Sequence, residues 1–201
     1  QIAASEAIPT GPPTVLAAGV PEGAIPGTTF ARFRCSTSGG LAPVDAAADG
    51  EVEDYRLGVV GFDFGDAPDS YGTQGTGSAW HQVDPDDGLR LGSCVDTEPD
   101  GQPAVGADGD DTSAGTSRVG SCFDDEDGVT FTSVATACQP ASATVTASAA
   151  GALDAWIDFN ADGAFGDPRD RIATALALVA GANVLPVNVP CDAPTRATYA
   201  R

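Results

Sequence analysis

Residues 153–179 read L-D-A-W-I-D-F-N-A-D-G-A-F-G-D-P-R-D-R-I-A-T-A-L-A-L-V, two apolar runs joined by an acidic loop. The runs Leu153–Phe159 and Arg171–Val179 are short and are separated by Gly, Pro, Asp and Asn. Short apolar or alternating runs bounded by turn residues are typical of β-strands. The sequence therefore predicts two neighbouring strands here, with a helix as the alternative for Ala173–Ala180.

The same pattern of short runs recurs along the rest of the chain. About 10 to 15 residues rich in Gly, Pro, Asp and Asn lie between successive runs, as in antiparallel β-sandwiches. The composition agrees, with 25 glycines, 15 prolines and only 6% aromatic residues. We therefore predict an all-β, antiparallel β-sandwich with long acidic loops, whose further strands are Thr28–Arg34, Asp54–Val60, Gly128–Val134, Ala143–Ala149 and Asn183–Val189.

The loop between the first two runs has the spacing of a calcium loop. Oxygen side chains at alternate positions converge on one point when the backbone curls, and a following glycine permits the sharp turn. The twelfth position of this loop is Arg169, which cannot ligate, so the loop departs from an EF-hand. A plain Asn/Asp-Gly hairpin turn has the same local composition and is the alternative. The predicted ligands are Asp158, Asn160, Asp162 and the Ala164 carbonyl, with Asp167 or Asp170 closing the loop.

The charge of the chain excludes several functions. The chain has 201 residues, with 9 basic against 29 acidic side chains and a net charge of −20. Such a chain does not bind nucleic acid or an anionic membrane through its own field, and no stretch is apolar enough for membrane insertion. It has no lysine and no methionine, and its single histidine, His81, has no recognisable nucleophile paired with it. We therefore expect no enzymatic activity and a packing or surface role for His81.

Acidic residues are concentrated in residues 84–127, a long loop region. Ten of the 29 lie between Asp96 and Asp127 and are opposed there by Arg118 alone. Like charges at this density repel, and they favour disorder unless a cation binds. Calcium takes 6 to 8 oxygen ligands from irregular backbone, so it would order the segment. A solvated acidic surface and a salt-adapted protein are the alternatives.

The cysteines indicate an oxidising compartment. The five cysteines include no C-x-x-C pair, which argues against zinc and thioredoxin-type sites. We expect disulfides Cys94–Cys122 and Cys138–Cys191, with Cys35 free or joined to another chain. The sequence begins at Gln1 without the features of a signal peptide, so we expect any such peptide to have been removed or to lie upstream.

An internal repeat organises the chain. Val20–Arg32 aligns without a gap with Val189–Arg201, at an offset of 201 − 32 = 169 residues. Aromatic, proline and arginine positions coincide, which favours tandem domains of one kind. We predict that residues 1–58 are the C-terminal part of one repeat, or a segment that completes another, and that residues 61–201 are most of the next repeat.

Five strings of sequence resemble a known family. In chain order they are G-E-V-E-D-Y at 50–55, D-F-G-D-A-P-D-S-Y-G-T at 63–73, L-G-x-x-V-D-x-E-x-D-G at 91–101, D-E-D-G-V at 125–129 and W-I-D-F-N-x-D-G at 156–163. Their order and spacing resemble the GEVED domain, a module found in tandem in secreted and cell-surface bacterial proteins. The resemblance implies a secreted or cell-surface β-sandwich of calcium-dependent character.

The resemblance also implies further calcium ligands, of which we expect about half to contact metal. With the loop at 158–170 they would bind two or more Ca²⁺ ions. The candidates are Glu53, Asp54, Asp63, Asp66 and Asp69, and separately Asp108, Asp110, Asp111, Asp124, Asp125 and Asp127.

The position of the repeat suggests a function. A sandwich that lacks its last strands leaves edges unpaired, and residues 1–58 are the kind of segment that could complete one, either in the same chain as a circularly permuted domain or in the next subunit. We therefore expect a calcium-stabilised extracellular structural repeat that self-associates with further copies or adjacent repeats into a surface fibre or stalk. The alternative is a binding module of a large adhesin that contacts carbohydrate, protein or a surface.

Overall fold

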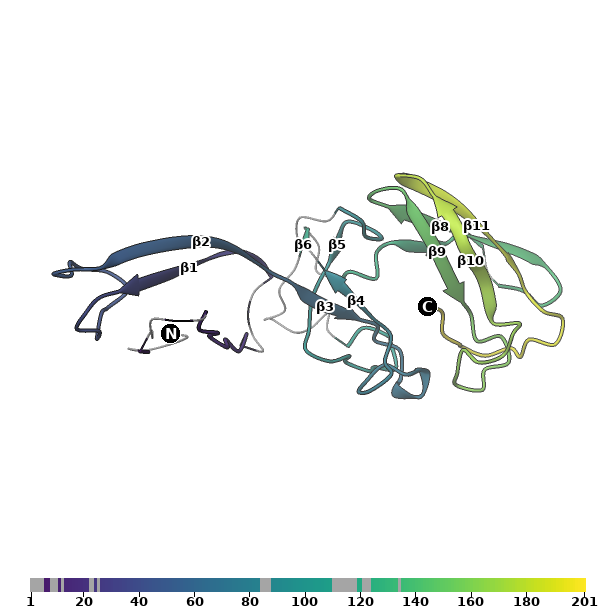
Figure 1. Cartoon of the computed structure of the whole chain (residues 1–201). Helices are drawn as coiled ribbons and strands as arrows, with labels where there is room; N and C mark the ends of the chain where they lie inside the picture. The colour runs from purple at the N-terminus through teal and green to yellow at the C-terminus, as the bar shows by residue number, and fades with distance from the viewer. Residues whose placement is uncertain are drawn as a thin grey trace. The chain divides into compact units, whose positions relative to one another are not determined.

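The computed structural model describes residues 6–7, 11, 13–21, 24, 26–83, 88–109, 119–120, 124–133 and 135–201. The chain divides into two compact units, Gln1–Val59 (unit 1) and Val60–Arg201 (unit 2). All pairings between the described strands are antiparallel (Figure 1). The prediction of an all-β fold is confirmed.

Unit 1 contains a β-hairpin. Strand β1 (Gly27–Cys35) pairs along its whole length with β2 (Glu51–Val59), and Ala31 lies opposite Tyr55. Residues opposite each other share a face and successive residues alternate between faces. One face therefore carries Ala31, Phe33, Tyr55 and Leu57 together with Thr29, Glu51 and Glu53. No described residue of unit 1 is buried.

Steric constraints require glycine at the first position of the G-E-V-E-D-Y string. Gly50 directly precedes β2 and has a φ of 93°, a conformation that other residues rarely adopt. A Cβ atom on Gly50 would lie 1.8 Å from the carbonyl oxygen of Cys35, the last residue of β1. Only glycine therefore lets the backbone pass this close to the end of β1.

The core of unit 2 is built from two sheets. In the first, β8 (Pro140–Ala147) lies between β11 (Gly181–Asn188) and β7 (Val129–Phe131). In the second, β9 (Gly151–Trp156) pairs with β10 (Arg171–Leu178). The core cluster takes residues from both sheets, among them Ala143, Val145, Ala147, Ala155, Ile157, Phe159, Leu178, Leu185 and Val187.

A third segment extends the β9 edge. Ala200 forms an antiparallel bridge with Ile157. The amide of Trp156 donates to the carbonyl of Arg201 over 2.8 Å, and the amide of Arg201 donates back to Trp156 over 3.0 Å. The amide of Asp158 donates to the Tyr199 carbonyl over 3.1 Å. Residues 199–201 therefore occupy a strand position beside the end of β9.

Unit 2 also contains smaller elements that precede this core in the sequence. Strand β3 (Gly61–Phe64) pairs with β4 (Trp80–Val83), and β5 (Cys94–Val95) pairs with β6 (Val119–Gly120). A 3₁₀ turn, η1 (Asp69–Tyr71), follows β3. None of these elements was predicted, because strands of two to four residues carry no periodic signal.

The structure tests several further predictions. Residues 171–178 form a strand, so the helical alternative for Ala173–Ala180 is wrong. The disulfide Cys138–Cys191 is confirmed, and Cys35 is a free, exposed cysteine. Cys94 is disulfide-bonded, while its predicted partner Cys122 lies outside the described residues. Among the described residues, no helix is long and apolar enough to cross a membrane.

Candidate functional site

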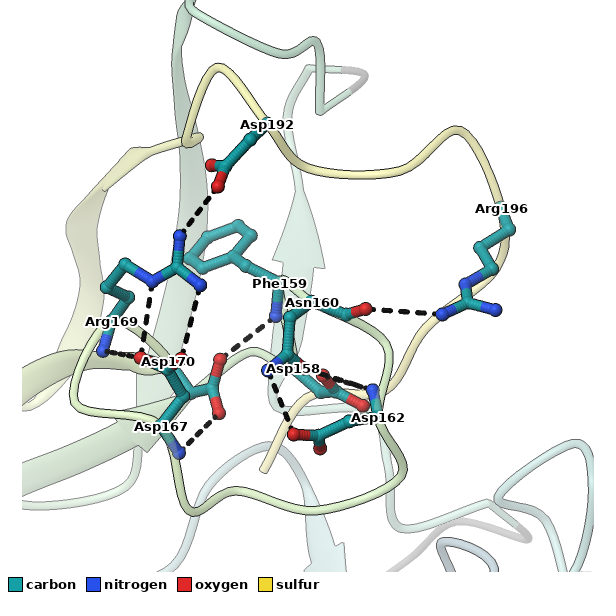
Figure 2. A network of polar contacts seen from close by, with 9 residues as sticks. All are labelled: Asp158, Phe159, Asn160, Asp162, Asp167, Arg169, Asp170, Asp192 and Arg196. Atoms are coloured by element: carbon teal, nitrogen blue, oxygen red, sulfur yellow. Dashed lines mark hydrogen bonds and ion pairs between the residues drawn. The ribbon is translucent and has the colours of Figure 1, made fainter.

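The loop between β9 and β10 is organised around a buried carboxylate. Asp158 is 0% exposed. One of its oxygens accepts hydrogen bonds from the Tyr71 hydroxyl at 2.7 Å and the Gly163 amide at 2.9 Å. The other oxygen accepts from the Asp162 amide at 3.2 Å (Figure 2). Burial raises the pKa of Asp158, but these donors outweigh it and hold the pKa below its ordinary value.

In the middle of the loop, side-chain oxygens accept hydrogen bonds from backbone amides two residues further along the chain. The Asn160 side-chain oxygen accepts from the Asp162 amide at 3.0 Å, and the Asp162 carboxylate accepts from the Ala164 amide at 3.0 Å. Gly163 has a φ of 90°, which permits the turn. Alternate oxygen side chains therefore curl the backbone around themselves, as their spacing predicted.

The end of the loop separates two acidic residues that were candidates to close it. Asp170 is 0% exposed, and its two oxygens accept from the amides of Phe159 and Asp167, each at 3.1 Å (Figure 2). Burial raises its pKa, and these two amides only partly oppose the rise. The Asp167 carboxylate instead pairs with Arg169 at 3.2 Å, and Arg169 also pairs with Asp192 at 2.9 Å. Asp170 thus faces the loop interior, and Asp167 faces a surface arginine.

A second group of carboxylates gathers where β3 meets the segment after β5. We call Asp63, Asp66, Asp96 and Glu98 the junction cluster. Glu98, 6% exposed, accepts from the Phe64 amide through Oε1 at 2.5 Å, and its amide donates to Phe62. Glu98 Oε2 is buried and, among the described residues, has no hydrogen-bond partner. Asp66 and Asp96 are also buried.

Electrostatics show that the junction cluster carries like charges at close range. Burial, then the charges of Asp125, Asp96 and Asp66, raises the pKa of Asp63 to about 7. Burial raises the pKa of Glu98 to about 9, and the charges of Asp63, Asp96 and Asp66 add to the rise despite the Phe64 amide. These groups therefore resist ionisation at neutral pH, or require a cation beside them.

Sequence reasoning named Asp63 and Asp66 as ligand candidates but missed Asp96 and Glu98. Both lie in the L-G-x-x-V-D-x-E-x-D-G string at 91–101, whose resemblance to the GEVED domain could have indicated them. Asp125 adjoins this group, since one of its oxygens accepts from the Asp96 amide at 3.1 Å.

The remaining candidates lie apart from these two groups or have local partners. In unit 1, Asp54 forms two hydrogen bonds of 2.7 Å with Arg32, and Glu53 accepts from the Tyr55 hydroxyl. Asp69 accepts from the Gln74 amide, and Asp127 binds the amide and hydroxyl of Ser93. Asp108 and Asp124 are exposed. Asp110 and Asp111 lie outside the described residues.

The two groups of carboxylates differ in how many of their oxygens already accept hydrogen bonds. Across the described part of the chain, no group of three or more His, Cys, Asp or Glu side chains is arranged to hold a metal ion. In the loop at 158–170 the side-chain oxygens already accept hydrogen bonds from backbone amides and from the side chains of Tyr71, Asn160 and Arg169. In the junction cluster, Glu98 Oε2 has no hydrogen-bond partner among the described residues, so of the two groups Glu98 and its neighbours fit a hard cation better.

One family model matches the C-terminal part of the chain. The family model of the GEVED domain matches residues 152–201, which confirms the predicted GEVED domain. The match covers β10, β11, nearly all of β9 and the loop at 158–170. No curated protein and no solved structure matches the chain.

Proposed function

We propose that this chain is a calcium-stabilised structural repeat of an extracellular surface protein, and that it assembles with further copies into a fibre or stalk. The observation that carries the assembly is the absence of any buried residue among those described in unit 1, whereas unit 2 has a core. A lone two-stranded hairpin is marginally stable in water. A further sheet packed against unit 1 would stabilise it, and an adjacent repeat or a second copy could supply that sheet.

Two observations support an extracellular location. Disulfides such as Cys138–Cys191 persist mainly in oxidising compartments. Residues 152–201 match the GEVED domain, and the resemblance described above associates this module with secreted and cell-surface proteins.

The junction cluster supports the calcium part of the proposal. A buried carboxylate oxygen without a partner, surrounded by further carboxylates, is costly unless a proton or a cation compensates it. Glu98, Asp63, Asp66 and Asp96 would hold the ion, which would neutralise their charges. Calcium accepts several carboxylates from irregular backbone, so it suits this group better than magnesium.

Thermal unfolding tests the calcium part. At free Ca²⁺ 100-fold above its dissociation constant, binding adds about 2.7 kcal/mol to the free energy of unfolding. We expect a higher melting temperature with Ca²⁺ than with chelator, and no such difference in Glu98→Gln. Asp162→Ala is the matched variant in the loop at 158–170. If this variant loses the calcium effect and Glu98→Gln keeps it, the ion binds in residues 158–170. Indifference of the wild-type chain to chelator would refute calcium binding.

Light scattering coupled to size-exclusion chromatography tests the assembly. We expect species larger than a monomer whose fraction grows with protein concentration and with Ca²⁺. A compact monomer both with and without chelator would contradict the assembly part of the proposal.

One observation favours the alternative of an adhesin module. Trp80 and Phe62 are 52% and 41% exposed, and their rings meet edge to face with centroids 5.0 Å apart. Exposed aromatic rings provide surfaces for binding sugars and proteins. A glycan array probed with the wild-type chain and with Trp80→Ala tests this: binding that the variant loses would favour the adhesin function.

A further inference from the structure

Two residues of the junction cluster lie close in sequence to a disulfide bond. Cys94, the first residue of β5, is disulfide-bonded and only 1% exposed. Asp96 and Glu98 follow it by two and four residues, and both are buried. The amide of Glu98 and one of its carboxylate oxygens bind the backbone of β3. The bond at Cys94 therefore restrains the short segment that supplies half of the junction cluster.

Further contacts hold this segment on both sides of Cys94. On one side, the amide and hydroxyl of Ser93 donate to the Asp127 carboxylate. On the other side, the amide of Asp96 donates to Asp125 at 3.1 Å. Between these two contacts, β5 pairs with β6. The disulfide of Cys94 thus lies between two contacts that bring residues 125–127 to the segment carrying Asp96 and Glu98.

Repulsion between the carboxylates opposes this arrangement when no cation is bound. Burial and then the charges of nearby carboxylates, Asp125 first, raise the pKa of Asp63, so these groups are close enough to interact. Like charges repel more strongly in a partly buried site than in water. A covalent cross-link limits how far the segments that carry them can separate. The oxidised chain therefore keeps its carboxylates together before any cation arrives.

We propose that the disulfide of Cys94 controls the calcium affinity of the junction cluster, so that the oxidised chain binds Ca²⁺ tightly and the reduced chain binds it weakly. In the reduced chain, Ca²⁺ must first draw the separated segments together, which costs part of the binding free energy. A dithiol can serve as the reductant: it passes two electrons and two protons to the bridge, which becomes two thiols, and is itself oxidised to a disulfide. This inference rests on the proposed calcium binding and concerns its regulation.

The coupling between the bridge and the cation must be reciprocal. If the bridge strengthens Ca²⁺ binding by some factor, Ca²⁺ raises the equilibrium constant for forming the bridge by the same factor. Disulfides form in oxidising compartments and are reduced in the cytosol. The junction cluster would therefore gain its affinity for Ca²⁺ only after the chain has left a thiol-rich compartment.

Calorimetric titration with Ca²⁺ tests the effect of the bridge on affinity. The variant Cys94→Ala/Cys122→Ala removes Cys94 and its predicted partner, and the matched control Cys138→Ala/Cys191→Ala removes the other bridge of unit 2. We expect the dissociation constant to rise at least about fivefold in the first variant and less than about twofold in the control. Equal dissociation constants in the wild type and the first variant overturn the inference and leave calcium binding intact. A wild-type chain that binds no Ca²⁺ overturns both.

The reciprocal measurement uses the wild-type chain, so it remains decisive if the first variant folds poorly. The chain is equilibrated in buffers of graded dithiothreitol to oxidised dithiothreitol ratio, with Ca²⁺ or with chelator, and its thiols are alkylated and located by mass spectrometry. We expect Ca²⁺ to shift the midpoint of Cys94 reduction by the same factor as the dissociation constant. The midpoint of Cys138 should stay unchanged, and Glu98→Gln should abolish the shift at Cys94. A Cys94 midpoint that is the same with Ca²⁺ and with chelator overturns the inference.

Discussion

Asp158 is a fully buried carboxylate, and donors from the loop around it and from outside the loop keep it ionised. The strongest is the Tyr71 hydroxyl, which reaches it from a segment 87 residues earlier in the chain. Burial, then the bond to Asp158, raises the pKa of Tyr71 to about 12, so its phenol stays protonated and donates. This hydrogen bond ties η1 to the GEVED-matching part of unit 2.

Tyr71→Phe removes the bond to Asp158 and the contact of the hydroxyl with the Thr198 side chain, while the ring keeps its contacts with Phe165 and Tyr199. A hydrogen bond to a charged group contributes roughly 1.5 to 3 kcal/mol, and we expect a loss of about 1.5 kcal/mol because the pair is only partly buried. Urea unfolding monitored by fluorescence measures it. Tyr199→Phe, which loses a bond to the exposed Val105 carbonyl, should cost less, and equal losses would argue against a special role for Asp158.

At the scale of elements, β8 and β11 form a continuous antiparallel pair in the core of unit 2. Their eight-residue register buries alternate residues such as Val145 and Val187. The disulfide Cys138–Cys191 joins the residues just before β8 and just after β11, across a sequence separation of 53. It therefore closes this pair at one end.

Replacing both cysteines by alanine should lower the free energy of unfolding by about 4 kcal/mol, because a cross-link of this loop length restricts the unfolded chain. The midpoint of urea unfolding checks this under oxidising conditions. Cys35→Ser is the control and should leave the midpoint unchanged, since Cys35 is exposed and unbonded. A double variant as stable as the wild type would show that the bridge adds nothing to the pairing.

Particular elements show what the sequence could and could not predict. Strands such as β8 were predictable because one buried face imposes a period of two on Ala143, Val145 and Ala147. Strand β5 has two residues and depends on β6, so it has no local pattern to find. In the same way, the hydrogen bonds within the loop at 158–170 join residues close in sequence, so the spacing of their side chains could indicate them. The hydrogen bond of Glu98 to the Phe64 amide joins residues 34 positions apart, which no local pattern reveals. The sandwich arrangement and the bound calcium remain predictions.

For the whole molecule, the net charge of −20 includes buried carboxylates that resist ionisation. Glu98 and Asp63 have pKa values raised to about 9 and about 7 in the folded chain, from ordinary values of 4.5 and 3.8. The folded chain thus retains protons that the unfolded chain has released. Their contribution to stability is complete below about pH 4 and is lost as the pH rises towards 9.

In the presence of chelator, the free energy of unfolding should therefore fall from pH 5 through pH 7 to pH 9. Urea unfolding at these three values measures the slope, and Glu98→Gln should flatten it because glutamine does not titrate. Stability that is constant or rises over this range would contradict the burial of ionisable carboxylates in the junction cluster. Saturating Ca²⁺ should reduce the slope, because a bound cation favours the ionised form.

The bridge between Cys138 and Cys191 also has a mechanical consequence. In a fibre under tension, force applied at the two ends of the chain passes through the sulfur atoms and not along the residues between them. The 53 residues of separation would otherwise add about 180 Å of extended chain. A stalk built from such units would therefore yield first outside β8–β11, and its length under load would be limited by a covalent bond.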